Sequence, residues 1–174
     1  MPQQPNPPKV VREAKEIVLG IDPGYDRVGW AIGAHNQQRK VVISAFGCIQ
    51  TSKKDTVFAR YKTIQKKLSE ILEKYQPTVL AIESVFFSKN KTTAIRVSEA
   101  KGVIIASCLP SISKIIEYTP PEIKLAVTGN GAASKTAITK MVQLQTGIQV
   151  GREIDDTVDA IAIVITHLAH HTFS

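Results

Sequence analysis

The sequence predicts an α/β fold with a mixed five-stranded sheet and helices on both faces. Two observations predict it. Three short apolar runs follow one another through short polar turns, which is typical of an antiparallel meander. After them, two further apolar runs alternate with segments of helical periodicity, which is typical of parallel strands joined by helical crossovers. With 174 residues, the chain is long enough for one domain with its own core.

Each strand is expected where a short apolar run is bounded by turn residues. The first run, IVLGID, is followed by the turn PGYDR. The fourth run, TVLAIE, is almost continuously apolar, as a parallel strand buried on both faces would be. The expected strands are 17–22, 28–35, 41–51, 78–83 and 112–118.

The helices are expected between and after the later strands. Residues 57–75 carry an apolar stripe at steps of three and four residues, with Thr56 or Asp55 as N-cap and Pro77 as the stop signal. Further helices are expected at about 93–108, in TPPEIKLAVTGNG, in SKTAITKMVQLQTG and at about 154–170. This order of elements is that of ribonuclease H-like folds, an analogy that by itself assigns no function.

The ends and the cysteines indicate where the protein works. Residues 1–16 contain the run PQQPNPPK, which predicts a flexible Pro-rich tail ahead of a single domain at 17–174. No apolar run is long enough to span a bilayer, and no signal-peptide pattern is visible, so a cytoplasmic location is expected. Cys48 and Cys108 lie in apolar runs, which favours small core residues over a disulfide.

The net charge of +7 leaves two interpretations open, a polyanionic partner or merely a basic surface. The distribution of charge helps more than the total. One segment gathers four basic residues: Lys89, Lys91, Arg96 and Lys101. This segment is therefore the first candidate for contact with a polyanion.

Four acids are candidates for one site. Asp22 ends IVLGID and Glu83 ends TVLAIE. If these strands pair in parallel, both carboxylates emerge at the same edge of the sheet, where open α/β sheets place their ligands. Two close like charges repel unless a cation lies between them. Asp156 and Asp159 lie three residues apart, on one face near the start of the last helix.

Each acid also has a structural interpretation. Asp155 or Asp156 can cap the last helix, with Asp159 in its first turn, and for the run DDTVD taken alone capping is the stronger interpretation. Asp22 can be the acid of an Asp-Pro-Gly bend. However, an apolar run follows Asp159, and no turn signal follows Glu83. Together the four acids favour a site for two Mg²⁺ ions, about 3.5–4 Å apart, which activate water for phosphodiester hydrolysis.

Two neighbouring groups of residues are interpreted as structural. Asp26 lies within the PGYDR turn and lacks the buried strand end that Asp22 has. His167 and His171 have the spacing of a zinc pair, but the frayed C-terminus of a solvated helix is the preferred interpretation.

The chain resembles RuvC-type Holliday junction resolvases from about Ile17 to Leu168. The resemblance rests on five motifs in order: GIDPG with the strand after it, AIESVFFSKN, AIRVSEAKGVIIA, EYTPPEIKLAVTGNGAASK and DDTVDAIAIVITH. GIDPG alone is weak, since sugar kinases and actin-like ATPases begin with similar strands, whereas the ordered set is specific. The Pro-rich extension before Ile17 departs from the family pattern and touches no motif.

The resemblance implies site residues as well as a fold. The family's metal-binding acids fall on the four acids selected above, Asp22, Glu83, Asp156 and Asp159. Lys124 in PPEIK and Lys135 in GAASK match basic residues that contact or neutralise phosphate in such enzymes.

DNA contacts are implied as well. Phe86, or its neighbour Phe87, matches the aromatic that stacks on a base near the junction centre, the alternative being a buried hydrophobic pair. The basic segment adds four expected contacts: Lys89, Lys91, Arg96 and Lys101.

The implied function is a Mg²⁺-dependent endonuclease that resolves four-way DNA junctions by paired symmetric nicks in recombination and repair. Two Mg²⁺ ions are expected per subunit, with Mn²⁺ able to substitute. Paired cuts imply a two-fold homodimer, for which the helix at 93–108 is a candidate face and packing on the sheet is the alternative. A branch-migration helicase complex is a further implied partner.

Three competing interpretations have the same sequence features to explain. The first is a ribonuclease H-like RNA-processing nuclease with the same metal chemistry. The second is an actin-like ATP-binding domain, for which 174 residues leave no room. The third is a non-catalytic junction-binding scaffold, against which the intact acids argue. The expected location is the bacterial cytoplasm or an organelle with bacterial-type recombination.

Overall fold

Five strands form a single mixed sheet in the order β3-β2-β1-β4-β5. The computed structural model describes residues 14–85, 91–149 and 155–171. The strands are β1 (Val18–Asp22), β2 (Arg27–His35), β3 (Val41–Gln50), β4 (Val79–Glu83) and β5 (Lys114–Tyr118). The first three pair antiparallel, and β4 runs parallel to both β1 and β5. The predicted meander, followed by parallel strands, is therefore confirmed.

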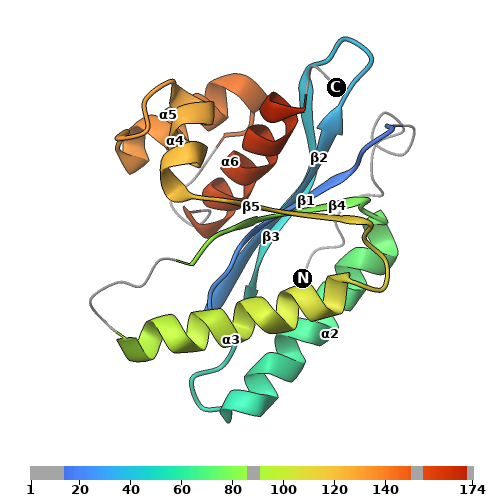
Figure 1. Cartoon of the computed structure of the whole chain (residues 1–174), viewed down its shortest axis with the longest axis vertical. Coiled ribbons are helices and arrows are strands. Elements are labelled where there is room, and N and C mark those ends of the chain that lie inside the picture. The colour runs from blue at the N-terminus through green and yellow to red at the C-terminus, as the bar shows by residue number, and fades with distance from the viewer. Residues whose placement is uncertain (1–13, 86–90, 150–154, 172–174) are drawn as a thin grey trace.

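Helices cover both faces of this sheet (Figure 1). On one face lie α2 (Val57–Tyr75) and α3 (Lys91–Cys108). On the other lie α4 (Pro120–Thr128), α5 (Lys135–Thr146) and α6 (Asp155–His170). Local signals set their ends: the Thr56 side chain accepts a hydrogen bond from the Ala59 amide at the start of α2, and Gln76 closes that helix in a left-handed conformation just before Pro77.

Strand β1 is buried on both faces, which explains its continuous apolar sequence. Leu19 and Ile21 point into the core formed with α2 and α3. Val18 points into the second core, formed with α4, α5 and α6. Since side chains alternate along a strand, one apolar segment serves both cores.

Gly20 sets how closely α6 approaches the sheet. A Cβ atom at this position would lie 2.5 Å from the Ala160 carbonyl oxygen and 2.6 Å from Val164 Cγ2. These contacts are too short for any side chain, so only glycine lets the helix pack directly on β1. The start of α6 is thereby held beside the strand that ends at Asp22.

Helix α3 packs on the sheet with the face that was a candidate for dimer contact. Ala94, Ala100 and Ile104 are all buried in the monomer, whereas Ile95 on another side of the helix is exposed. Val97 and Val103, the other members of that face, are only half-buried, so packing within the monomer accounts for part of it and the dimer contact stays a prediction. Cys108, at the end of α3, is buried as expected, and burial raises the pKa of its thiol to about 12.

No helix in the described part of the chain is both long and apolar enough to cross a membrane. Residues 1–13, which make up most of the predicted Pro-rich tail, lie outside the described residues. The division into tail and single domain therefore stays a prediction.

Candidate active site

Asp22 and Glu83 meet at one edge of the sheet, as the sequence predicts. Strands β1 and β4 pair in parallel with Ile21 opposite Ile82, so the next residue of each strand is an acid at the same end. The two side chains are half-buried and close enough to share a hydrogen bond. The local cause is simple, because both strands end at the same level of the sheet.

The surroundings of Glu83 disfavour its negative charge. Burial raises the pKa of this carboxyl, and the negative charge of Asp159 raises it further. The hydrogen bond with Asp22 and the positive charges of Lys101 and Lys124 act in the opposite direction. The net effect is a raised pKa of the Glu83 carboxyl. A bound cation would stabilise the negative charge of the carboxylate. The half-buried carboxylates are not fully neutralised by nearby positive charges. Such a site suits a divalent cation that prefers oxygen ligands.

Asp159 enters the site from α6, whose approach Gly20 permits. Its carboxylate Oδ2 lies 3.4 Å from Lys135 Nζ, at the start of α5. Ser134 caps this helix by accepting a hydrogen bond from the Ala137 amide, so the cap positions the first residue of α5 as well. The structure therefore brings the predicted acid and the predicted base together from two different helices.

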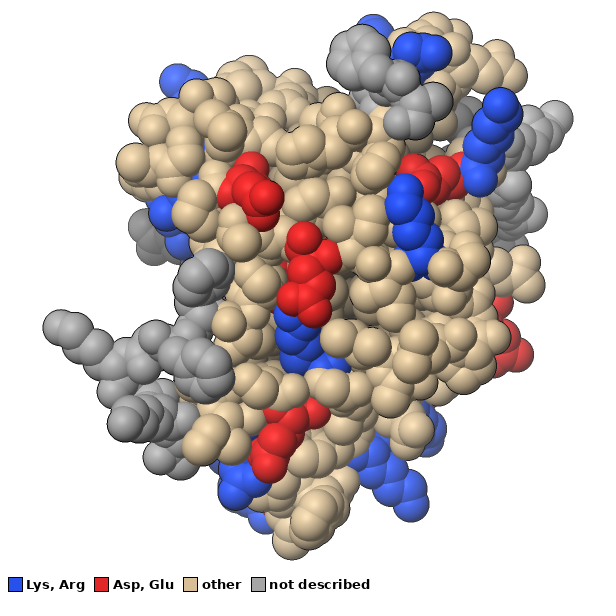
Figure 2. All heavy atoms as spheres, in the orientation of Figure 1, with Lys and Arg blue, Asp and Glu red and all other residues tan. Residues whose placement is uncertain are grey.

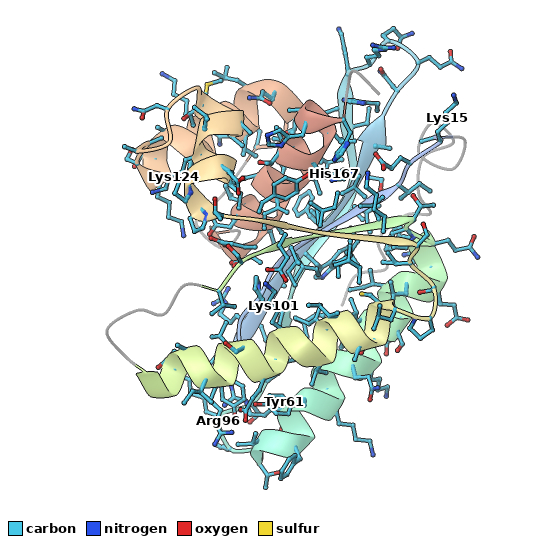
Figure 3. All side chains as sticks on the ribbon, viewed as in Figure 1. Lys15, Tyr61, Arg96, Lys101, Lys124 and His167 are labelled. Carbon is cyan, nitrogen blue, oxygen red and sulfur yellow. The ribbon has the colours of Figure 1, made fainter. Side chains whose placement is uncertain are left out.

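Lys124 lies on α4, within electrostatic reach of Glu83 (Figure 3). Its helix begins directly after β5, in which Tyr118 pairs with Glu83. The turn between them is fixed by a capping box between Thr119 and Glu122. The connection is short and capped, so Lys124 is held near the acids by local structure.

A small hollow lies against these acids. Its volume is about 190 Å³. One side is formed by the ends of β1 and β4 with the residues after them, and the other by Thr93, Ala94 and Val97 of α3. Helix α3 is thus the wall that faces the carboxylates across the hollow.

Asp156 lies in the first turn of α6, but its side chain is outside the described residues. Among the side chains that the structure describes, no three acids, histidines or cysteines form a complete group for a metal ion. Asp22, Glu83 and Asp159 therefore stay predicted ligands, as does Asp156.

The expected DNA contacts are of three kinds: side chains that the structure does not describe, the partly exposed Arg96, and the buried Lys101. Phe86, Phe87 and Lys89 fall outside the described residues, and Lys91 begins α3 with its side chain undescribed. Arg96 lies on α3, where its guanidinium is 2.8 Å from Glu99 Oε2.

For Lys101 the expected DNA contact is corrected. Its side chain is only 10% exposed, and Nζ lies 2.7 Å from Glu117 Oε2 on β5. An ammonium group that is buried and already paired is poorly placed to reach a phosphate. In Figure 3 Lys101 lies between α3 and the sheet, so it anchors the helix wall beside Glu83.

Two structural interpretations have different outcomes. Asp26 is structural as expected: it pairs with Arg60 of α2, whose hydrogen bond lowers the pKa of the Asp26 carboxyl. The expectation of a solvated helix end is wrong for His167, which is fully buried. Its Nδ1 lies 3.0 Å from the Tyr118 hydroxyl, and Nε2 lies 3.3 Å from Glu16 Oε2.

Sequence reasoning missed three residues that shape the site: Gly20, Glu117 and Arg60. Gly20 left a signal, since a glycine inside a buried strand often marks close backbone approach. Glu117 and Arg60 left none, because their partners Lys101 and Asp26 are distant in sequence.

Comparison with known proteins identifies the family of the chain. The family model "Crossover junction endodeoxyribonuclease RuvC" matches residues 18–167. The enzyme of that name from Brachyspira hyodysenteriae is 45% identical over 156 residues, which cover 89% of this chain and 95% of the relative. The one from Caldicellulosiruptor saccharolyticus is 40% identical over 151 residues, covering 87% and 91%.

Solved structures agree as well. The chain is similar to T. thermophilus RuvC, solved in complex with Holliday junction substrate, with a TM-score of 0.82 and 26% identity. The match covers 89% of this chain and 94% of that one. The chain therefore belongs to the RuvC family of crossover junction endodeoxyribonucleases.

Proposed function

We propose that this nuclease cuts four-way DNA junctions at the site formed by Asp22, Glu83, Asp156 and Asp159, with divalent metal ions as cofactor. The observation that carries the proposal is the pair of strand-end carboxylates, Asp22 and Glu83, in a setting that raises the pKa of Glu83. Family membership supports the reaction, and the T. thermophilus relative was solved with a Holliday junction as substrate.

The four acids are proposed to hold two Mg²⁺ ions per subunit, with Mn²⁺ able to substitute. When bound, such ions activate the attacking water and stabilise the leaving oxygen of a phosphodiester. The acids orient the ions, and the hollow beside α3 admits the phosphate. Lys124 and Lys135 offset the negative charge that builds up on the phosphate in the transition state.

A junction has two equivalent strands to cut, so we propose that the enzyme works as a two-fold homodimer with one site per subunit. Because Ala94, Ala100 and Ile104 of α3 are buried in the monomer, the contact is proposed to use exposed parts of the surface. A branch-migration helicase complex is a proposed partner. A cytoplasmic location is part of the proposal, and the bacterial origin of the compared relatives supports it.

The test uses a synthetic mobile four-way junction and Mg²⁺. We expect paired symmetric nicks from the unchanged protein and none from Asp22→Asn or Glu83→Gln. The matched control is Glu70→Gln, since Glu70 is an exposed acid on α2 that pairs with Lys67. Linear duplex and RNA substrates are included. Random duplex degradation, preference for RNA, or cutting that survives Asp22→Asn would contradict the proposal.

A further inference from the structure

A second hollow adjoins the one beside the acids. It has a volume of about 600 Å³ and lies between the β1–β2 turn, the turn before α2, and α3. Thr93 and Val97 of α3 line both hollows, so the two lie next to each other along one helix. The larger one is called the side groove below.

The side groove differs from the first hollow in its charge. Four basic residues line it: Arg27, Lys53, Arg60 and Arg96. Its one lining acid, Asp26, is paired with Arg60 and lies 3.8 Å from Lys53 Nζ. The first hollow is instead lined by the acids Asp22 and Glu83. Along α3, the hollow lined by acids, which suits cations, is therefore followed by the side groove, which suits anions. Figure 2 shows acidic and basic side chains lying next to one another on the face of the molecule drawn there.

The floor of the side groove is held rigidly. The Arg60 guanidinium lies 3.5 Å from the centre of the Tyr25 ring and donates hydrogen bonds to the Thr51 hydroxyl and the Tyr25 carbonyl. Arg60 is buried, so its positive charge lies beneath the surface of the side groove. The Tyr61 ring packs edge-on against the Tyr25 ring, with 5.8 Å between the ring centres.

The same network reaches the wall of the groove. The Tyr61 hydroxyl donates to Glu99 Oε2 at 2.6 Å, and the same oxygen accepts from Arg96 at 2.8 Å. Figure 3 shows Tyr61 and Arg96 together where α2 and α3 meet. Because Glu99 orients Arg96, and Arg60 fixes the turn, a ligand binds without first ordering these side chains.

We infer that the side groove binds the phosphate backbone of the DNA strand next to the scissile phosphate, with Lys53 as a direct phosphate contact and Arg27 and Arg96 beside it. The inference rests on the proposed function and adds the direction in which the strand leaves the acids, towards the β1–β2 turn. Lys53 suits this role because its side chain is 83% exposed, in the turn between β3 and α2. A flexible, exposed ammonium is a point-charge contact for phosphate that carries no sequence preference.

The first experiment measures junction affinity as a function of salt, without divalent metal, for the unchanged protein and for Lys53→Gln. One lost phosphate contact lowers the slope of log Kobs against log salt by about 0.7 to 0.9. The matched control is Lys66→Gln, an exposed lysine of α2 that does not line the groove. We expect the control to keep the slope and Lys53→Gln to lower it. Equal slopes for both variants would overturn the inference.

The second experiment locates the contact. A neutral methylphosphonate replaces one phosphate at a time on each side of the scissile position, and affinity is measured with both proteins. We expect one position, on one side only, at which the methylphosphonate weakens binding by the unchanged protein. At that position the same replacement should cause no further loss of affinity in Lys53→Gln. If the two losses simply add at every position, Lys53 contacts none of these phosphates.

The two proposals fail differently. If the unchanged protein neither binds nor cuts the junction, the proposed function fails. If the unchanged protein cuts the junction while Lys53→Gln behaves like the Lys66→Gln control in both experiments, only the side groove is excluded. Thermal melting of both variants checks that each is folded.

Discussion

The two ends of α6 carry polar groups of opposite kinds, a half-buried acid and a buried histidine. At its start, Asp159 lies near Glu83, and burial and like charge raise the pKa of Glu83. At its other end, His167 lies between Tyr118 and Glu16, and burial lowers its pKa to about 4. The raised pKa of Tyr118, about 12, keeps its hydroxyl protonated and able to donate to His167 Nδ1.

The difference between these ends separates function from structure. At the histidine end, the Tyr118 hydroxyl is hydrogen-bonded to His167 Nδ1 and the Glu16 carboxylate lies beside Nε2, so the groups that face the ring come from the chain itself. The acidic end combines negative charges and is relieved only in part by Lys124 and Lys135. A fold tolerates that imbalance where a ligand supplies the missing charge. Opposite responses to mutation and pH are therefore expected at the two ends.

The largest effect is expected for Glu83→Gln. Junction cleavage in Mg²⁺ should fall at least about a thousandfold, or roughly 4 kcal/mol of barrier. Without metal, the same variant should unfold at a higher temperature, because a carboxylate whose pKa is raised in the fold destabilises it above that pKa. A gain of about 1 kcal/mol corresponds to a rise of about 3 °C in Tm.

Calorimetry with and without Mg²⁺ measures this effect. Adding the ion should stabilise the unchanged protein more than the variant, so that their difference in Tm narrows. If Glu83→Gln is less stable than the unchanged protein in the absence of metal, the acidic end of α6 does not destabilise the metal-free fold, and the contrast with the histidine end is wrong. Glu70→Gln should change neither cleavage nor the response to Mg²⁺.

Gly20→Ala should cost about 3 kcal/mol of folding free energy, because the new methyl group would overlap the Ala160 carbonyl of α6. Cleavage should fall too, since the helix that carries Asp159 must shift. Gly102→Ala in α3 is the matched control. There a Cβ meets no atom within 4 Å, so alanine should stabilise the helix by about 0.5–1 kcal/mol. Denaturant unfolding of both variants decides, and equal stability would refute the role given to Gly20.

Acid should weaken the histidine end. His167 has a folded-state pKa of about 4 against an ordinary value of 6.5, so below pH 6.5 the unfolded chain binds the proton more readily. Its contribution to stability is complete above pH 6.5 and is lost as the pH falls towards 4, by up to about 3 kcal/mol. The charges facing it oppose one another, since Glu16 favours protonation whereas His171 and Lys114 disfavour it.

Unfolding free energy measured from pH 7.5 to 4 tests this loss. His167→Gln should flatten the curve over that range, while the exposed His170→Gln should leave it unchanged. If both variants keep the full slope, the acid sensitivity arises elsewhere.

The smallest effect is expected for Tyr118→Phe, which removes the hydroxyl that hydrogen-bonds to His167. The loss should be about 1 kcal/mol, because the ring stays packed while one buried hydrogen bond is lost. The pKa of His167, followed by NMR, should also change in the variant. Unchanged stability and an unchanged pKa together would show that the hydroxyl does not support the histidine.

The sequence predicts well what depends on local pattern. The proximity of Asp22 and Glu83 was predictable because each residue ends an apolar strand. Parallel pairing of these strands brings their ends to the same edge of the sheet. The start of α2 followed from the expected cap at Thr56, and its end from Pro77.

What depends on the direction of a helix face was not predictable from the sequence. Lys101 stands in a basic segment, and only the docking of α3 on the sheet turns it towards Glu117. His167 stands near the end of the last helix, and only contact with β5 and Glu16 buries it. In both cases the deciding partner is remote in sequence, so periodicity and composition carry no trace of it.

The placement of the acids also bears on how the enzyme comes into being. Asp22 and Glu83 become neighbours when β4 joins β1, but Asp159 arrives only when α6 docks over Gly20. This docking closes a contact between widely separated parts of the chain, which is the kind of step that forms slowly in folding. An intermediate that has the sheet but lacks the docked helix would have an incomplete set of ligands. Nuclease activity should therefore appear in refolding together with the last tertiary contacts, later than the secondary structure.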